Sequence, residues 1–302
     1  MRAMAWRTLW SGRLRDGLLI LALATVPQAL GAGQAIAETA PQSLTAVETA
    51  PEIHALAQAL QLDRLAGVLK AEGLDYGNLL DADLLAGRGG AGWTAAVGRI
   101  YAPDRLRRDF LHLLSQELAA DPLVPDMLDF LQSDLGRRII TSELEARQAM
   151  LEPARKDKSR LAWMALAQDN PRRAGQIIEF VRLNDLMEGN VAGGMNANLA
   201  FYQGLAMTAP PALRLPEEDL LAAVAGQEQA IRAETEAWLY PYLVMAYDPL
   251  EDAGLDAYLA FCKTPAGRRL NSALFAVFNG LFARVSAEMG REAGLVLRGQ
   301  EI

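Results

Sequence analysis

The chain contains a single cysteine, Cys262, and only two histidines, His54 and His112, among its 302 residues. One cysteine cannot form an intrachain disulfide, and its place at the end of an apolar segment predicts a buried, inert thiol rather than a reactive one. The two histidines lie in different predicted helices and lack the spacing that zinc sites use. A Gly-x-Ser-x-Gly nucleophile turn is also missing. These shortages predict a protein without metal, without cofactor and without enzymatic activity.

Residues that favour strands are also scarce, and no run of alternating polar and apolar residues is found. Helix-forming residues dominate, which predicts an all-α fold. A hydrophobic content of 51% is enough for one large domain or two of ordinary size. The formal net charge is −8. Because nucleic acids and anionic lipid surfaces require basic patches, this charge argues against both as partners.

The first 37 residues have the pattern of a secretory signal peptide. Four arginines precede a short apolar segment, Leu18 to Leu30, and the sequence Ala35-Ile36-Ala37 has the small-x-small form that signal peptidase cuts. We expect cleavage after Ala37 and a mature protein in the periplasm with no membrane span. The alternative, an uncleaved anchor, needs about 20 apolar residues, and this segment is shorter and contains Pro27. Cleavage takes the formal charge to about −11.

A nine-residue pattern occurs twice in the chain and organises the rest of the sequence. In each copy an apolar segment ends at a phenylalanine, a hydroxyl residue follows three positions later, and a Gly-Arg-Arg triplet opens a long amphipathic run. The repeated residues are Phe130, Ser133, Gly136, Arg137 and Arg138 in the first copy, and Phe261, Thr264, Gly267, Arg268 and Arg269 in the second.

This pattern is typical of one helix ending and another beginning. Ser133 and Thr264 are predicted N-caps, and Pro265 suits a first helical position. The glycines predict a close approach between helices. The arginines lie near helix starts, where the helix dipole does not favour cations. Either one arginine of each pair bonds a carboxylate of a neighbouring helix while the other is solvated, or the pairs form an anion or partner site.

The self-similarity extends beyond the pattern. Thr94–Val97 matches Leu221–Val224, and Asp121–Leu123 matches Asp248–Leu250, at a constant spacing of 127 that becomes 131 after this point. A weaker match places Leu62 on Leu183. We therefore expect an internal duplication that forms two related helical bundles around a pseudo-twofold axis. The expected segments are a flexible leader (38–50), a first repeat (51–152), a linker with a short helix (153–170) and a second repeat (171–302).

At the repeated pattern the sequence resembles DUF2059, a secreted bacterial family described as a domain of unknown function. The family feature is a Phe-x-x-Ser/Thr-x-x-Gly turn before a long helix, which both copies contain, the second more clearly. The resemblance covers much of the mature chain. It implies an exported helical protein and brings no activity and no catalytic residues.

A glycine-rich run from Gly87 to Trp93 resembles the flavin-nucleotide loop of the respiratory NADH dehydrogenase flavoprotein subunit over about seven residues. Successive backbone N–H groups of this kind can hold a phosphate. The run has no preceding strand and lacks the Lys-Ser/Thr of a nucleotide loop. We therefore interpret it as a hinge between helices.

An amide-rich stretch is the strongest candidate for a binding site. Side chains four residues apart share a helix face, so amides and an aromatic ring here are suited to a polar small molecule or a peptide. Helix capping and hydrogen bonds between the repeats are the alternative, and the more favoured one. The stretch consists of Asn184, Asp185, Glu188, Asn190, Asn196, Asn198 and Tyr202.

Together these observations predict an exported, non-enzymatic helical protein that binds or scaffolds a protein or small-molecule partner. A carrier for an apolar ligand is the second hypothesis, and a large closed apolar pocket between the bundles would favour it. An enzyme is the third, and it would need carboxylates and His112 around a cleft.

Overall fold

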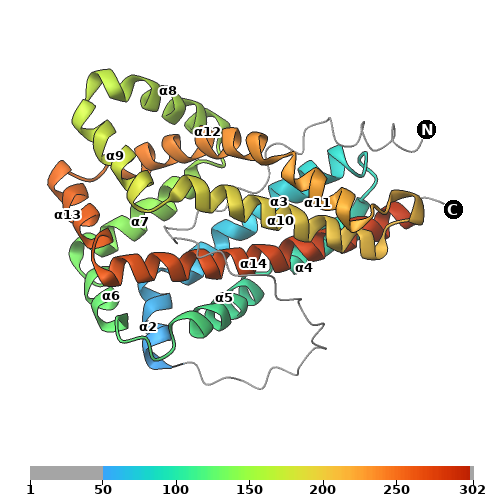
Figure 1. The fold of residues 1–302 in the computed structure, drawn as a ribbon, viewed down its shortest axis with the longest axis horizontal. Helices are drawn as coiled ribbons and strands as arrows, with labels where there is room; N and C mark the ends of the chain where they lie inside the picture. The colour runs from blue at the N-terminus through green and yellow to red at the C-terminus, as the bar shows by residue number, and fades with distance from the viewer. Residues whose placement is uncertain (1–49, 300–302) are drawn as a thin grey trace.

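The computed structural model describes residues 50–299, and within this range the chain forms α-helices joined by turns, with no strand. The all-α fold expected from the composition is therefore confirmed. The predicted signal peptide and all but the last residue of the predicted leader lie outside the described residues. Figure 1 shows that helix α14 (Pro265–Arg298) runs along the long axis of the molecule, with the other helices around it.

The first half of the described chain forms helices that begin at prolines or capping residues. Pro51 and Pro103 occupy first-turn positions, where an N–H would have no partner. Gln61 takes a left-handed conformation, with φ of 51°, immediately before the second helix. The helices are α2 (Pro51–Ala59), α3 (Leu62–Asp83), α4 (Gly90–Ile100), α5 (Pro103–Leu118), α6 (Val124–Leu131) and α7 (Asp134–Ala149).

A glycine after an apolar helical run often marks a helix end, but Gly73 lies inside α3 and is buried. A Cβ atom at this position would overlap the ring of Tyr101, so the glycine provides room for an aromatic side chain instead of a helix stop. The glycine-rich run forms the turn between α3 and α4, where Gly87 and Gly90 have positive φ angles. The backbone N–H of Gly89 donates to Asp81 at 2.7 Å.

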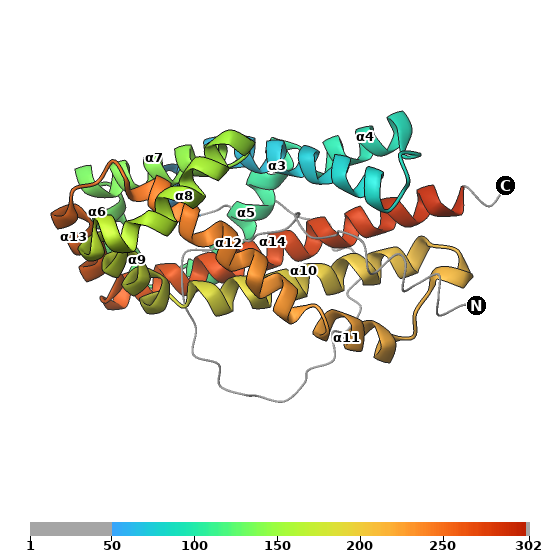
Figure 2. The ribbon, with the colours of Figure 1, turned by 90° about the horizontal axis from the view of Figure 1, so that it is seen from above.

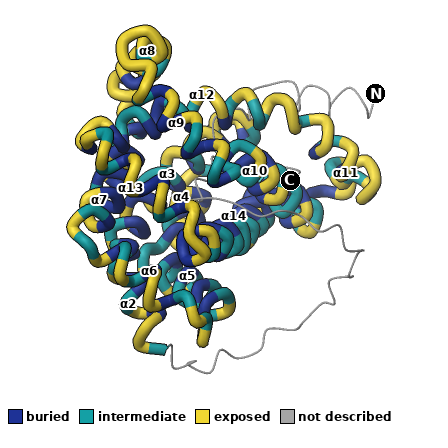
Figure 3. Tube along the Cα trace, turned by 60° about the vertical axis from the view of Figure 1, so that its left-hand side comes forward, coloured by how far each residue is buried: buried dark blue, intermediate teal, exposed yellow. Residues whose placement is uncertain are grey.

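The segment 153–170, expected as a linker followed by a short helix, is one continuous helix, α8 (Pro153–Asp169). Pro153 opens it, and the charged residues that suggested a linker form its solvent-facing surface. Ser159 is its one buried residue, and its hydroxyl donates to the carbonyl of Pro241. Figure 3 shows α8 as an exposed helix at the outer edge of the molecule.

The second half repeats the helix order of the first. Asp185, with φ of 48°, precedes α10 as Gln61 precedes α3. By this correspondence Leu62 is equivalent to Leu186. The weak sequence match had paired Leu62 with Leu183, three residues earlier. The helical segment that follows Pro216 is broken after Ala225, where α11 ends. The elements are α9 (Pro171–Leu183), α10 (Leu186–Thr208), a 3-10 turn η1 (Pro211–Leu213), α11 (Glu217–Ala225), α12 (Glu228–Tyr247), α13 (Asp252–Cys262) and α14.

The two sets of helices share one hydrophobic core. They do not close into the two separate bundles that the sequence analysis expected. The last helix of each set packs on the other set: α7 lies against α12, and α14 lies against α5. Phe110 of α5 meets Phe278 of α14 edge to face, with ring centroids 5.5 Å apart. The buried side chains accordingly form one cluster that draws on both halves. Figure 2 shows α14 between the α3, α4 and α7 side and the α10 and α12 side.

Helices α10 and α14 run side by side in the same direction and form the most extensive helix pair. Glycines permit this closeness, because a Cβ atom on Gly204 would overlap the carbonyl of Ala287, and one on Gly290 would overlap that of Phe201. By length and hydropathy α14 is also sufficient for a membrane span. However, 61% of its most apolar window is buried within the described fold.

Candidate functional site

The amide-rich stretch starts in the turn between α9 and α10 and continues along α10. Helix α9 ends at Leu183, and Asp185 adopts the left-handed conformation before α10 begins. Asn184 is buried at this turn and accepts a hydrogen bond from the Nδ2 of Asn271 on α14, at 3.3 Å. Partial burial raises the pKa of Asp185, and the nearby charge of Glu188 adds to the effect.

The next residues of the stretch make contacts within or beside α10. Glu188 forms a bidentate ion pair with Arg232 of α12, with one N–O distance of 2.7 Å. This hydrogen-bonded pair lowers the pKa of Glu188. Asn190 is buried and donates to the carbonyl of Leu186, one turn earlier, while Asn196 is exposed. These positions therefore lie on different sides of the helix.

Asn198 and Tyr202 meet at a third residue that the sequence analysis did not single out, Gln227. Asn198 donates to the Gln227 side-chain oxygen at 2.9 Å, and the Gln227 amide donates to the Tyr202 hydroxyl at 3.3 Å. This chain connects α10 to the turn between α11 and α12. Four of the seven predicted residues, Asn184, Glu188, Asn198 and Tyr202, thus make inter-helix contacts. None of the seven lines the cleft described below.

The repeated pattern has the same geometry in both copies. Ser133 accepts a hydrogen bond from the N–H of Gly136, and Thr264 accepts one from the N–H of Gly267, each at 3.0 Å. Both hydroxyls donate back to the carbonyl of the phenylalanine three residues earlier, at 2.6 and 2.7 Å. A Cβ on either glycine would overlap that same carbonyl. The close approach expected at the glycines is therefore to the end of the preceding helix.

The first arginine of each pair satisfies the end of the helix before it. Arg137 donates to the carbonyl of Gln132, the C-cap of α6, and Arg268 donates to the carbonyl of Lys263, the C-cap of α13. The last carbonyls of a helix lack partners within it, so these bonds stabilise both helix ends. Arg137 in addition pairs with Asp134 at 2.6 Å.

The second arginine of each pair crosses to the opposite half. Arg269 pairs with Asp121 in the turn after α5, at 2.8 Å, and Arg138 donates to the carbonyl of Pro249 in the turn after α12, at 3.3 Å. These two turns correspond to each other in the duplication that the sequence suggests. All four arginines therefore bind groups of the protein itself. Only Arg269 bonds a carboxylate from another helix or its adjoining turn, as the first interpretation expected, whereas Arg138 bonds a backbone carbonyl.

A cleft opens where the two halves differ. With the spacing of 131, Ala149 at the end of α7 corresponds to Gly280, but α14 continues to Arg298. This extension packs over α10, where an added Cβ on Gly204 or Gly294 would overlap its neighbour across the pair. Helix α3 takes the place of α10 in the first half. No such extension covers it, because the chain turns after α7 and Pro153 begins α8. The uncovered face of α3 is one wall of the cleft.

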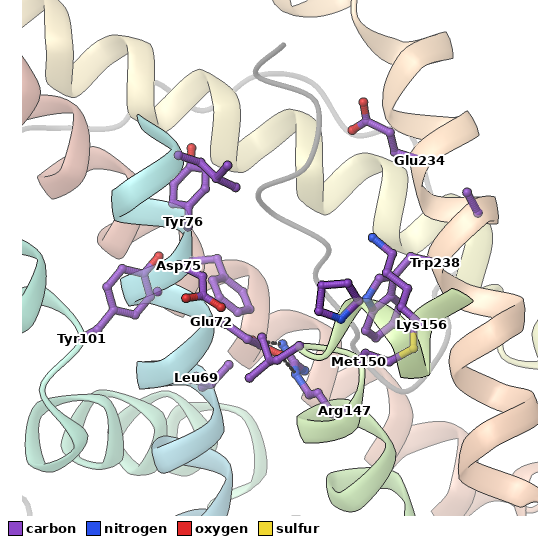
Figure 4. A pocket seen from close by; sticks show the side chains of 16 residues that line it. Leu69, Glu72, Asp75, Tyr76, Tyr101, Arg147, Met150, Lys156, Glu234 and Trp238 are labelled. Carbon is purple, nitrogen blue, oxygen red and sulfur yellow. Dashed lines mark hydrogen bonds and ion pairs between the residues drawn. The ribbon is translucent and has the colours of Figure 1, made fainter. Parts of the chain in front are cut away.

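The cleft has a volume of about 380 Å³ and opens to solvent. Figure 4 shows side chains of α3 on one side and those of α8 and α12 on the other. The lining mixes apolar, aromatic and charged side chains. It consists of Leu69, Glu72, Gly73, Asp75, Tyr76, Leu79, Tyr101, Arg147, Met150, Leu151, Pro153, Lys156, Glu234, Ala237, Trp238 and Phe282.

A buried ion pair forms the floor of the cleft. The Nε and Nη2 atoms of Arg147 donate to the two carboxylate oxygens of Glu72 at 2.7 and 2.9 Å. Arg147 is only 5% exposed, whereas Glu72 is 26% exposed. Burial acts to lower the pKa of Arg147, but the adjacent carboxylate outweighs it and raises the pKa. This bidentate geometry fixes both side chains at the base of the cleft.

Aromatic rings form much of the walls. Burial raises the pKa of Tyr76 and of Tyr101, so both hydroxyls remain protonated at any physiological pH. Trp238 stacks on Tyr242, with ring centroids 4.7 Å apart and planes 13° apart. The aromatic part of the walls is thus uncharged and rich in π faces.

Behind the floor lies a second buried acidic group, Glu143 of α7. Tyr247 donates to its Oε1 at 2.9 Å and Tyr258 at 3.4 Å, while Tyr242 donates to its backbone carbonyl at 3.3 Å. Burial raises the pKa of Glu143 to about 7, and the two tyrosine hydrogen bonds only partly counteract this. This carboxyl comes from the first half of the chain and its tyrosine partners come from the second.

Sequence reasoning did not find this site. Glu72 and Arg147 are 75 positions apart, and each resembles an ordinary polar helix residue. The available signal was the difference in length between the two copies: Pro153 ends the first long run, whereas no proline interrupts the second after Pro265. His112 and the glycine-rich run are not part of the lining. Within residues 50–299 no group of three or more potential ligands is arranged for a metal ion.

No protein-family model, no curated protein and no solved structure matches this chain. The cleft is therefore the main structural indication of its function. The cleft is open and partly charged, so it is not the closed apolar cavity that would favour a carrier of apolar ligands.

Proposed function

We propose that this chain is an exported, non-enzymatic binding protein that holds a small molecule in the cleft between α3 and α12. One observation carries the proposal: a cleft of about 380 Å³ with a buried ion pair at its floor and aromatic walls. Small-molecule sites have volumes of roughly 300–1,000 Å³ and combine apolar walls with a few fixed polar groups. Both criteria are met here.

The setting of this function is also a proposal. The signal-like first 37 residues support export to the periplasm, with cleavage after Ala37 and no membrane span in the mature chain. The matching helix order, caps and arginine contacts of the two halves support a tandem duplication and agree with a DUF2059-like protein. On this proposal the duplication produced the two matching sets of helices. Because α7 is shorter than α14, one face of α3 stays uncovered and forms the cleft.

The direct test is to recover the bound molecule. The protein is purified from its periplasm without denaturation and then denatured, and the released small molecules are identified by mass spectrometry. Ala237→Trp places a large ring in the cleft, whereas Ala233→Trp, one turn earlier on α12, places the same ring on an exposed surface outside it. We expect a molecule released from the wild type and from Ala233→Trp but not from Ala237→Trp. Equal release from all three would refute the assignment.

Scaffolding of a protein partner is a second candidate, and the surface of α8 favours it. Leu161 and Met164 on this helix are 57% and 65% exposed, which is unusual for large apolar side chains. Trp163 on the same helix stacks on Tyr240, so α8 is held firmly against α12. If this surface binds a protein, the variant Leu161→Glu/Met164→Glu will lose that partner in crosslinking experiments while Ala237→Trp retains it.

A further inference from the structure

The charges of the cleft indicate the kind of ligand it holds. Arg147 and Glu72 neutralise each other at the floor. The other charged side chains of the lining are Asp75, Glu234 and Lys156, so carboxylates outnumber cations. Apart from Lys156, the one cation an anionic ligand could meet in the lining is Arg147, and reaching it would displace Glu72 and leave that carboxylate without its partner. The lining therefore disfavours an anion.

The aromatic walls add a second, independent preference. The faces of Trp238 and of the tyrosine rings carry partial negative charge and attract organic cations. The tyrosine hydroxyls are neutral, and they present oxygen atoms that accept hydrogen bonds from an N–H donor. Figure 4 shows Asp75 and Tyr76 on α3 across the cleft from Trp238, so a ligand between them meets a carboxylate on one side and a ring on the other.

We propose that the ligand of the cleft is an organic cation: a protonated or quaternary amine attached to an apolar body. The apolar body packs against Leu69, Met150 and Phe282, and the charged nitrogen lies near the mouth, between the carboxylates and the aromatic rings. The negative net charge of the chain raises the local concentration of such a ligand. This inference rests on the proposed function, because it names the class of molecule for the same cleft.

The test uses three probes that differ mainly in charge: phenethylamine, 2-phenylethanol and phenylacetate. Each is titrated by calorimetry into the purified mature protein after its native ligand has been removed by dialysis. We expect the amine to bind more tightly than the alcohol, by about tenfold, and the acid to bind most weakly. Ala237→Trp should abolish binding of the amine, which places the site in the cleft.

Charge-specific variants complete the test. Asp75→Asn should weaken binding of phenethylamine several-fold and leave 2-phenylethanol unchanged, whereas Asp83→Asn, on the same helix but outside the cleft, should change neither. Preferred binding of the alcohol or the acid would overturn the cationic class and leave the cleft as a binding site. Absence of binding by all three probes would also overturn the cationic class. The molecule released from the native protein would then test the proposed binding function separately.

Discussion

Phe130 and Phe261, which occupy the same place in the two copies of the repeated pattern, stack face to face with ring centroids 3.7 Å apart and planes only 3° apart. Equivalent residues touch each other only where a twofold axis passes between them. Arg138 and Arg269, also equivalent in the pattern, each contact a turn of the opposite half. The contact of Phe130 with Phe261, packed against one continuous core, is the one expected if the two halves derive from a duplication and are related by a twofold axis.

The capping residues provide the first prediction. Ser133→Ala and Thr264→Ala each remove a side-chain acceptor from a helix start, so each should lower the free energy of unfolding by about 1 kcal/mol. Thr264→Ser keeps the acceptor and should cost much less. Urea denaturation of the three variants measures this. A large difference between the two alanine variants would show that the two turns are not equivalent.

Replacing each of two glycines of α3 by alanine should change the stability of the fold in opposite directions. Gly73→Ala places a methyl group into the ring of Tyr101 and should destabilise the fold by about 1–3 kcal/mol. Gly67→Ala meets nothing within 4 Å and should stabilise the helix by roughly 0.5–1 kcal/mol. Thermal unfolding of both variants provides the comparison. Stabilisation by Gly73→Ala would contradict the packing described for the wall of the cleft.

The ion pair at the floor should behave as a buried pair. Glu72→Leu leaves the charge of Arg147 buried without a partner and should cost about 3 kcal/mol or more. The double variant Glu72→Leu/Arg147→Met removes both charges and should recover a large part of that loss. A double-mutant cycle of unfolding free energies measures the coupling. Additive effects would mean that the two side chains do not depend on each other.

Glu143 should make stability depend on pH. Burial raises its pKa to about 7 from the ordinary value of 4.5, so the folded protein keeps a proton that the unfolded chain releases. Stability should therefore fall as the pH rises from about 4.5 to about 7 and change no further above that, by up to about 3 kcal/mol at roughly 1.4 kcal/mol for each pKa unit. The groups around the carboxyl are Tyr242, Tyr247, Tyr258 and the Arg147–Glu72 pair.

The variant Glu143→Gln keeps the shape and the acceptor oxygen but cannot release a proton. It should remove this fall in stability and be more stable than the wild type at pH 8. Glu145→Gln, an exposed position on the same helix, is the matched control and should leave the pH profile unchanged. Unfolding free energies across pH 4 to 8 decide the matter. A wild-type profile retained by Glu143→Gln would assign the dependence to other groups.

Local sequence signals were enough for the all-α class and for the repeated caps, because Ser133, Thr264 and Pro265 act on their own neighbours. The same reasoning failed at Gly73, whose role depends on Tyr101, a residue 28 positions away. It also failed for the shared core and for the cleft. Both depend on which helices lie together, and no local pattern shows that α7 packs on α12 or that Arg147 reaches Glu72.

The amide-rich stretch shows why composition alone was misleading. Its polar side chains are conspicuous in the sequence, but Asn184 and Asn198 use their amides to connect neighbouring helices, and Asn190 bonds back to its own helix. The residues of the cleft are less conspicuous because they are scattered over α3, α7, α8, α12 and α14. A site of this kind is visible only once the chain is folded.

A crystal structure of the protein purified from its native source without denaturation is the most direct test of the proposed binding site. We predict a non-protein molecule in the cleft, in contact with Trp238 and lying above the Arg147–Glu72 pair. A cleft that contains only water, with a bound molecule elsewhere or none at all, would contradict the central claim.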